Sequence, residues 1–235
     1  MKDYTQLTKN RFERKFAISK LSTQEIEMVV KRNSAFFSEI FKQRYINNIY
    51  LDTPNLTFFF DNNIGKSNRI KIRIRWYGDM FSLIAHPILE FKIKEGAVGS
   101  KLSFPLKAFN LDKDFTISSL KQVFHNSDLP QWVLNQLEVV EPTLLNRYKR
   151  KYFRSFNKDY RLTIDSEIKY TNIAARINSL SQTRNEETDD IVVELKYDVE
   201  KDSFAHLITN QFPFRLTKNS KYVNGISKFR TNLAL

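Results

Sequence analysis

The feature that most constrains the fold is a stretch in which basic and apolar residues alternate strictly. From Arg69 to Arg75 the sequence reads RIKIRIR, so every second residue is basic and every residue between is isoleucine. Because successive side chains of a β-strand point to opposite faces, this stretch predicts a strand with one cationic face and one apolar face. Such a strand separates a polar environment from a hydrophobic one.

Four other stretches repeat this alternation, and each places one carboxylate on its charged face. The four carboxylates are Glu13, Glu90, Asp165 and Glu194. The basic residues that share a face with them are Arg11, Lys15, Lys92, Lys94, Arg161 and Lys196. A single strand of this kind fits an antiparallel sheet with one solvated face. Several strands rich in arginine and lysine instead favour a sheet closed into a barrel, with the charged faces inside and the Ile, Phe and Val faces outside.

The rest of the pattern predicts a single domain over residues 1–235, with short helices packed against the outside of the barrel. A capping box at Ser22 and Glu25 opens a predicted helix that ends near Arg32. Further helices are predicted at 117–124, 130–137 and 203–210, further strands at 46–52, 101–106, 145–153 and 214–223, and a loop at 179–190. The expected fold class is therefore α+β, with a closed, mostly antiparallel β-barrel.

The net charge of +12 indicates a polyanionic partner. A barrel interior with about ten cationic groups is unstable unless anions enter it. A chain of phosphates supplies those anions, because the arginine fork matches phosphate oxygens and lysine contributes a point charge. The carboxylates are then suited to a hard divalent cation, Mg²⁺ or Mn²⁺, which prefers oxygen ligands and bridges carboxylate to phosphate.

Two further features restrict the class of protein and its location. The chain contains no cysteine, which excludes disulfides, thiolate zinc sites and cysteine nucleophiles. Its charged N-terminus lacks the apolar region of a signal peptide, and no window approaches the ~18 apolar residues of a membrane helix. We therefore expect a cytoplasmic protein without a membrane segment of its own.

Taken in order along the chain, these residues resemble the VTC-type polyphosphate polymerase domain of the triphosphate tunnel metalloenzyme (CYTH-like) superfamily. The matching pieces are Arg11-x-Glu13-x-Lys15, 49–53, 71–75, 89–92, Lys101, Pro142, Tyr148-x-Arg150, Arg161-x-Thr163-x-Asp165, 193–196 and 220–222. Each piece alone has little specificity, but the ordered set spans nearly the whole chain. The resemblance implies a tunnel that binds ATP and polyphosphate together with Mn²⁺ or Mg²⁺.

The resemblance also implies a role for each matching residue. Arg73, Arg75 and Lys221 would hold the phosphate that is transferred. The residues expected to bind the other phosphates are Lys15, Lys71, Lys92, Lys101, Tyr148, Arg150, Arg161, Lys196 and Ser220. The expected metal ligands are Glu194 as the main ligand, with Glu13, Glu90 and Asp165 as further candidates. For each carboxylate the alternative is a salt bridge that orients a neighbouring lysine or arginine.

Two departures from the family pattern bear on function. The hydrolytic and cyclase branches of the superfamily typically have a glutamate where this chain has Arg11, and this favours the VTC type. The eukaryotic polymerases of the family also carry an inositol-phosphate-sensing domain and membrane helices, which this sequence does not show. Any link to a membrane would therefore come from a membrane-protein partner.

The sequence thus predicts an enzyme that transfers the terminal phosphate of ATP to a growing polyphosphate chain. Hydrolysis of tripolyphosphate or a nucleoside triphosphate in the same tunnel is the nearest alternative, because no residue decides between phosphate and water as the acceptor. A non-enzymatic polyphosphate-binding or inositol-phosphate-binding module would need the basic face but not Glu194. Nucleic acid is not expected, because the basic residues alternate with apolar residues that are predicted to be buried.

Overall fold

The chain is described by a computed structural model over residues 11–96, 98–173 and 185–230. Its main strands are β1 (Arg11–Ile18), β2 (Ser38–Asp52), β3 (Arg69–Tyr77), β5 (Ile88–Glu95), β6 (Val98–Pro105), β8 (Glu141–Arg154), β9 (Tyr160–Asn172), β10 (Asn185–Thr188) and β11 (Ile191–Asp198). In the described residues they form one nine-stranded antiparallel sheet in the order β1-β11-β9-β8-β2-β3-β5-β6, with β10 paired to β9. A separate pair is formed by β4 (Leu83–Ile84) and β7 (Phe109–Asn110).

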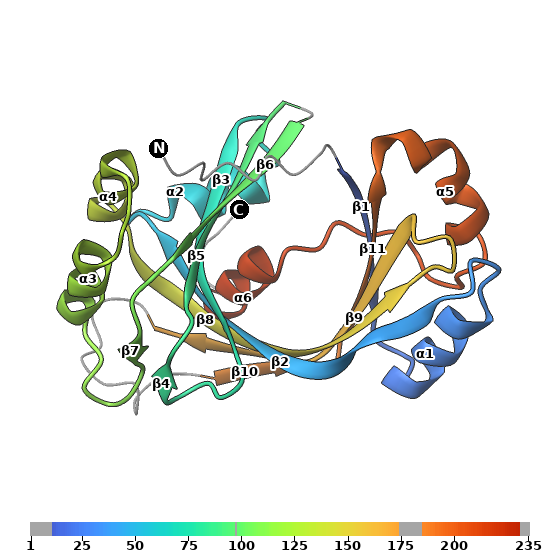
Figure 1. Cartoon of the computed structure of the whole chain (residues 1–235), viewed down its shortest axis with the longest axis horizontal. Coiled ribbons are helices and arrows are strands. Elements are labelled where there is room, and N and C mark those ends of the chain that lie inside the picture. The colour runs from blue at the N-terminus through green and yellow to red at the C-terminus, as the bar shows by residue number, and fades with distance from the viewer. Residues whose placement is uncertain (1–10, 97, 174–184, 231–235) are drawn as a thin grey trace.

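The sheet curves strongly around a hollow (Figure 1). The long strands β2, β8 and β9 form its floor, while β3, β5 and β6 rise on one side and β1 and β11 on the other. The expected closed barrel is not found. In the described ranges β1 and β6 are the two ends of the sheet and do not pair with each other. The two walls meet instead through side chains, as where Lys92 of β5 binds Glu13 of β1 at 3.1 Å.

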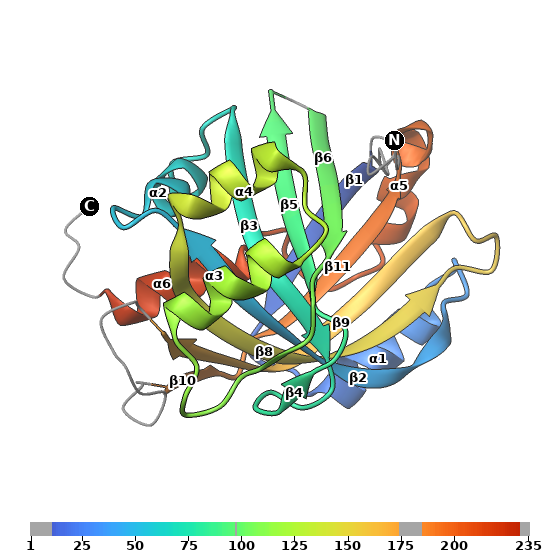
Figure 2. The same cartoon turned by 60° about the vertical axis from the view of Figure 1, so that its left-hand side comes forward.

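In the described ranges, four helices cover the convex side of the sheet, and the sequence predicts all four. These helices are α1 (Thr23–Arg32), α3 (Ile117–Asn126), α4 (Gln131–Glu138) and α5 (Asp202–Thr209). Figure 2 shows α3 and α4 lying across the outer face of β3 and β5. The isoleucines of the alternating strand, Ile72 and Ile74, are buried there in one cluster with Leu120 of α3 and Val133 of α4. Removing this apolar face from water stabilises the curved sheet from outside and leaves its polar face turned inward.

Local signals account for the start of α1. The Ser22 hydroxyl accepts a hydrogen bond from the Glu25 amide at 3.3 Å, and the Glu25 carboxylate accepts one from the Ser22 amide at 2.8 Å. This reciprocal pair satisfies two of the amides that a helix leaves free at its N-terminus. The predicted capping box is therefore confirmed.

The last helix, α6 (Lys221–Phe229), corrects two expectations. No strand forms at 214–223 as predicted: an isolated bridge between Phe16 and Leu216 is all that pairs there, and α6 takes up residues 221–223. It also lies inside the hollow rather than outside the sheet (Figure 1). Gly225 permits this position: a Cβ atom there would lie 2.5 Å from Leu144 and 2.6 Å from Tyr170. No larger residue lets the helix approach β8 and β9 so closely.

A buried carboxylate fixes α6 to a second helix that the sequence did not predict, α2 (Thr57–Asn63). Asp52 is fully buried and accepts hydrogen bonds from the amides of Thr53, Phe58 and Phe59 at 2.7–2.9 Å. It also accepts one from the Tyr222 hydroxyl of α6. Burial raises the pKa of Asp52 above its ordinary value, while these hydrogen bonds act to lower it. The contact holds the first turns of α2 and α6 together at one end of the hollow.

The predicted loop at 179–190 is only partly correct. Residues 185–188 form β10, and residues 179–184 lie outside the described residues.

Among the helices in the described ranges, none has both the length and the apolar character needed to cross a membrane.

Candidate active site on the concave face

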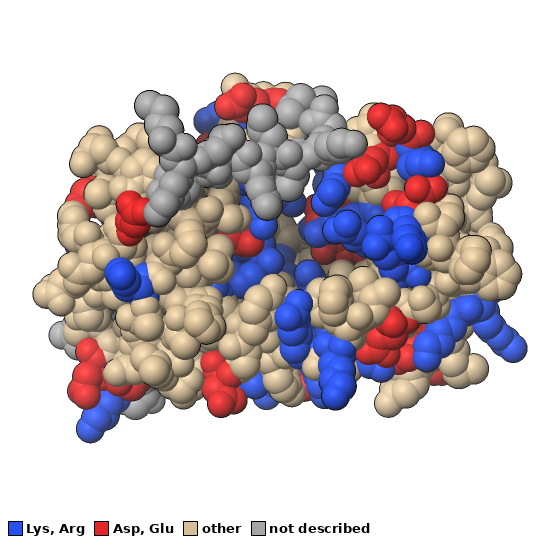
Figure 3. All heavy atoms as spheres, in the orientation of Figure 1, with Lys and Arg blue, Asp and Glu red and all other residues tan. Residues whose placement is uncertain are grey.

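Strand register brings the predicted site residues from distant parts of the chain to the concave face. Residues directly opposite each other on neighbouring strands share a face. Arg73 lies opposite Glu90, and Arg150 lies opposite Asp165. Space-filling representation shows lysine and arginine side chains gathered around the central opening (Figure 3). The alternation read from the sequence thus corresponds to a cationic lining of the hollow.

Glu90 organises the cations of β3 and β6. Its carboxylate accepts hydrogen bonds from Arg73 Nε at 2.7 Å and from Lys101 Nζ at 3.0 Å, and Arg75 Nη1 lies 3.6 Å away. Burial alone would raise the pKa of Glu90, but the positive charges of Arg73, Arg75 and Lys101 hold it well below its usual range. Glu90 is therefore ionised, and it fixes the direction in which the two guanidinium groups point.

Asp165 has the same role on the opposite side of the floor. This fully buried carboxylate binds Arg150 Nε at 2.5 Å, Arg150 Nη2 at 2.7 Å and Lys221 Nζ at 2.5 Å. Burial opposes ionisation, but Arg150 and Lys221 keep the pKa of Asp165 well below its ordinary value. Lys221 is the first residue of α6, so the helix inside the hollow delivers one of the predicted cations.

Tyr148 lies between these two groups of cations. Its hydroxyl lies 3.4 Å from Arg75 Nη2, and the Lys221 ammonium lies 4.6 Å from its ring centroid. Burial would raise the pKa of Tyr148, but the charges of Arg150 and Arg75 lower it to about 8. The hydroxyl is therefore a strong hydrogen-bond donor towards an anion in the hollow.

Glu13 and Glu194 form a third group, in which two carboxylates share two lysines. Lys196 Nζ lies 3.2 Å from Glu13 and 3.1 Å from Glu194, while Lys15 Nζ lies 3.5 Å and 3.8 Å from the same two carboxylates. Lys92 adds a contact to Glu13 at 3.1 Å. Although burial raises the pKa of Glu13, the three lysines bring it well below its usual range.

Only one of these groups suits a divalent cation. No group of three or more Asp, Glu, His or Cys side chains is gathered for a metal within the described ranges. An arginine holds each of Glu90 and Asp165 at hydrogen-bond distance. Glu13 and Glu194 are held by lysines, and the Arg150 guanidinium lies 3.7 Å from Glu194. Glu194 lies opposite Thr163, whose buried hydroxyl has no hydrogen-bond partner among the described residues. Glu194, Glu13 and the Thr163 hydroxyl are oxygen donors of the kind that Mg²⁺ and Mn²⁺ prefer.

The other predicted residues differ in how firmly they are held. Lys71 Nζ donates to the Ser220 hydroxyl at 3.0 Å, so these two predicted residues meet across the hollow. Arg161 is exposed opposite Lys196 and has no ion-pair partner in the described part of the chain.

Arg11, the departure from the family pattern, lies at the exposed end of β1 and binds Asp198 at 3.1 Å. Its charge is therefore already paired.

Cations outnumber carboxylates in the lining. Against Glu13, Glu90, Asp165 and Glu194 stand ten basic residues: Lys15, Lys71, Arg73, Arg75, Lys92, Lys101, Arg150, Arg161, Lys196 and Lys221. The formal excess is six positive charges. The four carboxylates orient part of the lining but leave a strong attraction for a polyanion.

Sequence reasoning missed the polar floor beneath Arg75. Asn48 Oδ1 accepts a hydrogen bond from Arg75 Nε at 3.0 Å, and Asn48 Nδ2 donates to Asn146 Oδ1 at 2.9 Å. Both asparagines are fully buried. Asn48 lies at an inward position of β2. The sequence signal that could have revealed its role was a polar amide side chain among apolar neighbours in a predicted strand. Which arginine it supports depends on the pairing of β2 with β3.

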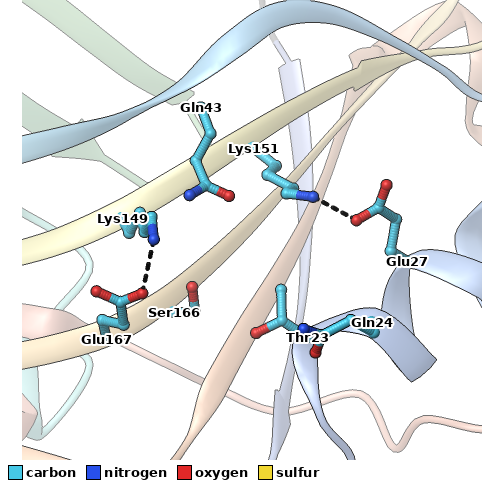
Figure 4. Close-up of a pocket in the computed structure, with 8 residues that line it drawn as sticks. All are labelled: Thr23, Gln24, Glu27, Gln43, Lys149, Lys151, Ser166 and Glu167. Carbon is cyan, nitrogen blue, oxygen red and sulfur yellow. Dashed lines mark hydrogen bonds and ion pairs between the residues drawn. The ribbon is translucent and has the colours of Figure 1, made fainter.

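A pocket of about 150 Å³ on the convex side provides a contrast (Figure 4). It lies between α1 and the outer faces of β2, β8 and β9 and also contains two lysines. Lys149 is paired with Glu167 at 2.9 Å and Lys151 with Glu27 at 2.5 Å, so each positive charge is matched by a negative one. None of the predicted site residues lines it. This pocket therefore lacks the excess of positive charge found on the concave face.

Comparison with known structures places the fold in a class. A protein from Vibrio parahaemolyticus assigned as an adenylate cyclase matches with a TM-score of 0.51 and 13% identity, covering 93% of this chain and 98% of its own. A Pyrococcus horikoshii protein matches with a TM-score of 0.52 and 12% identity over 93% and 99% of the two chains. A Hippeastrum protein assigned as an adenylyl cyclase, and described as having a dominant triphosphatase activity, matches with a TM-score of 0.50 and 13% identity over 92% and 96%.

The curved sheet with a cationic concave face thus has the fold of these three proteins. Within this class the chain belongs to the VTC domain family, whose profile matches residues 9–230. A search of the curated proteins returned no match.

Proposed function

We propose that this protein is a polyphosphate polymerase-like phosphotransferase that uses ATP and a divalent cation. The observation that carries the proposal is the excess of cations over carboxylates on the concave face of a VTC-family fold. Among the structural neighbours, the Hippeastrum protein is described as a triphosphatase, so a triphosphate is a ligand for which this fold is suited. ATP supplies such a triphosphate.

Phosphate binding in this proposal follows from the groups that the carboxylates hold in place. Arg73 and Arg75 direct their guanidinium groups into the hollow from one wall, and Lys221 enters from α6. The arginine fork binds two oxygens of one phosphate, which fixes its orientation as well as its position. Because Glu90 and Asp165 hold these side chains before substrate arrives, little reorganisation is needed when charge develops in the transition state.

The transfer step joins two phosphates. A terminal oxygen of the polyphosphate chain attacks the γ-phosphorus of ATP, the bond from that phosphorus to the β–γ bridging oxygen breaks, and ADP leaves with that oxygen. Positioning and neutralisation of charge supply most of the catalysis in such reactions. The cationic side chains of the hollow bring together two polyanions that would otherwise repel each other.

A divalent cation would be held by Glu194 and Glu13, with the Thr163 hydroxyl beside them. When bound, Mn²⁺ or Mg²⁺ supplies positive charge to phosphate oxygens near the reacting bond. The lysines that these carboxylates share, Lys15 and Lys196, would then be available to contact the phosphate chain. Glu90 and Asp165 serve in this proposal as orienting carboxylates.

Incubation with ATP and Mn²⁺ tests the proposal. We expect ADP to accumulate while most of the transferred phosphate appears in chains that a polyacrylamide gel separates. Short polyphosphate is added as a primer, so that slow initiation is not mistaken for lack of activity. Stoichiometric orthophosphate without chains would refute the polymerase and support the alternative.

That alternative is hydrolysis of tripolyphosphate or a nucleoside triphosphate, and the Hippeastrum neighbour favours it. Arg11→Glu restores the residue typical of the hydrolytic branches. If Arg11 favours phosphate as the acceptor, this variant should shift product from chains towards orthophosphate. Asp198→Asn is the matched control, because it frees Arg11 from its partner without adding a carboxylate.

A further inference from the structure

A cluster of three aromatic rings and one guanidinium lies at the rim of the hollow, and the sequence did not predict it as part of the site. We refer to Phe41, Arg44, Tyr77 and Tyr152 as the rim cluster. Arg44 Cζ lies 4.1 Å from the ring centroid of Tyr77, 5.0 Å from that of Tyr152 and 6.0 Å from that of Phe41. The rings of Phe41 and Tyr152 meet edge to face, with centroids 5.8 Å apart.

The rim cluster continues the phosphate-binding face. Tyr77 follows Arg75 by two residues on β3, so both side chains point to the concave side. Arg44 lies opposite Arg150 in the pairing of β2 with β8, and Arg150 Cζ lies 6.0 Å from the Tyr152 ring. The cluster therefore begins one strand repeat, about 7 Å, beyond the arginines proposed to bind phosphate.

Packing of the core accounts for Tyr152 but not for Phe41 and Tyr77. Phe41 is 58% exposed and Tyr77 is 48% exposed. Arg44 Nε donates to the Tyr152 hydroxyl at 3.1 Å, but no carboxylate pairs with Arg44 within the described ranges. Exposed aromatic faces next to an uncompensated cation suit a ligand that is both flat and anionic.

We propose that the rim cluster binds the base and α-phosphate of a nucleoside triphosphate whose remaining phosphates lie in the hollow. The exposed rings of Phe41 and Tyr77 stack on the base, and the free nitrogens of Arg44 contact the α-phosphate. The inference rests on the proposed function, since it requires a triphosphate to occupy the concave face. It assigns the nucleotide to this end of the hollow and leaves the opposite end to the polyphosphate chain.

Stacking on exposed rings does not read the edge of a base, so recognition should depend on ring size rather than base identity. ATP and GTP should bind about equally, and CTP and UTP more weakly. Tripolyphosphate has no base and should not depend on the rings. Loss of ATP binding without loss of tripolyphosphate binding therefore distinguishes the role of the rim cluster from that of the other residues of the lining.

Titration calorimetry with ATP and with tripolyphosphate tests the inference. The double variant Phe41→Ala/Tyr77→Ala should weaken ATP binding about tenfold or more and change tripolyphosphate binding less than about twofold, because only the stacking is lost. Tyr77→Phe keeps the ring and should bind ATP like the parent. Phe156→Ala is the matched control, since Phe156 is a solvent-exposed aromatic in the turn between β8 and β9.

Unchanged ATP binding in the double variant would overturn the inference. So would an equal loss for ATP and tripolyphosphate, because the rings would then act on the phosphate site or on the fold. If the parent itself bound no tripolyphosphate, the proposed function would fail first and this inference with it. The two failures are therefore distinguishable.

Discussion

Lys71 differs from the other basic side chains of the hollow in what burial does to its charge. Burial, together with the positive charges of Lys92 and Lys15, lowers the pKa of Lys71 to about 7. Its only polar contact in the described part of the chain is the Ser220 hydroxyl, and no carboxylate offsets the cost of its charge. Lys15 is lowered less, to about 8, because Glu13 partly compensates for burial. Near neutral pH these two lysines are therefore the cations of the lining that most readily lose their charge.

Tripolyphosphate binding should weaken as pH rises through this range. The protonated lysine attracts the ligand and the neutral amine does not, so affinity should fall between about pH 6 and about pH 9. Lys71→Arg, whose charge does not titrate, should flatten the fall. Calorimetry of both proteins at each pH measures the effect, and the comparison cancels the ionisation of the ligand. Parallel curves for the parent and the variant would show that Lys71 does not bind the ligand.

The lowered pKa values also bear on folding. A lysine whose folded pKa lies below its unfolded value of about 10.4 binds more protons when unfolded. Lys71 and Lys15 should therefore make the free energy of unfolding without ligand increase as the pH rises above about 7. Ligand binding and stability thus depend on pH in opposite directions, as expected for a site whose charges are unfavourable until an anion arrives.

Glu194→Gln tests the metal assignment at the same scale. The amide keeps the shape of the side chain but removes its charge, so turnover at limiting Mn²⁺ should fall about tenfold or more while tripolyphosphate binding is retained. Steady-state rates across a Mn²⁺ titration provide the measurement. Glu167→Gln on the convex side is the matched control, because Glu167 also pairs with a lysine. Normal turnover of the Glu194 variant would reassign that residue to an ion pair.

Among the elements, α6 contributes most to the site for its length. It provides Lys221 to Asp165, and its N-cap residue Ser220 binds Lys71. Tyr222 stacks on Tyr50 of β2 with ring centroids 4.9 Å apart. The helix therefore closes part of the hollow with apolar side chains while its first turn faces the phosphate-binding residues.

The position of α6 depends on Gly225. Gly225→Ala places a methyl group against Leu144 and Tyr170, at separations that real Cβ atoms do not adopt, and should cost about 1–3 kcal/mol of unfolding free energy. Urea denaturation measures this loss. Ser227→Ala in the same helix is exposed and should be neutral or slightly stabilising. Equal stability of both variants would mean that α6 does not pack so closely.

At the scale of the whole molecule, the hollow holds more positive charge than its own carboxylates neutralise. A polyanion should therefore act as part of the folded structure. Tripolyphosphate at about 100 times its dissociation constant should raise the Tm by about 5–10 °C, and added salt should reduce the rise. Arg73→Ala/Arg75→Ala should abolish most of the shift while the protein remains folded. A shift of the same size in parent and variant would exclude these two arginines from the site.

The open sheet gives this molecule a feature that a closed barrel lacks. Where β1 and β6 end the sheet, the walls are linked by the Lys92–Glu13 ion pair. An ion pair between partly exposed side chains contributes little to stability. The distance between the walls is therefore set mainly by the curvature of β2, β8 and β9, and by α6 between them.

The sequence determined which face is charged in each strand that alternates, but not in residues 145–153, which are basic on both faces. Alternation is a local property of the backbone, so the inward positions of Arg73, Arg75, Glu90 and Glu194 could be read without knowing a single strand pairing. The capping box of α1 was equally local. These signals predicted an antiparallel sheet with a cationic face and one carboxylate on each of several strands.

Only the tertiary structure decided which of these side chains meet. Arg150 binds Asp165 rather than Glu90, and α6 lies inside the hollow, because of strand register and the close approach at Gly225. The rim cluster combines side chains from β2, β3 and β8, none of which shows an unusual pattern by itself. A strand's own sequence fixes the direction of its side chains. Their neighbours depend on how far each strand is shifted along the next, and that is set by packing across the whole sheet.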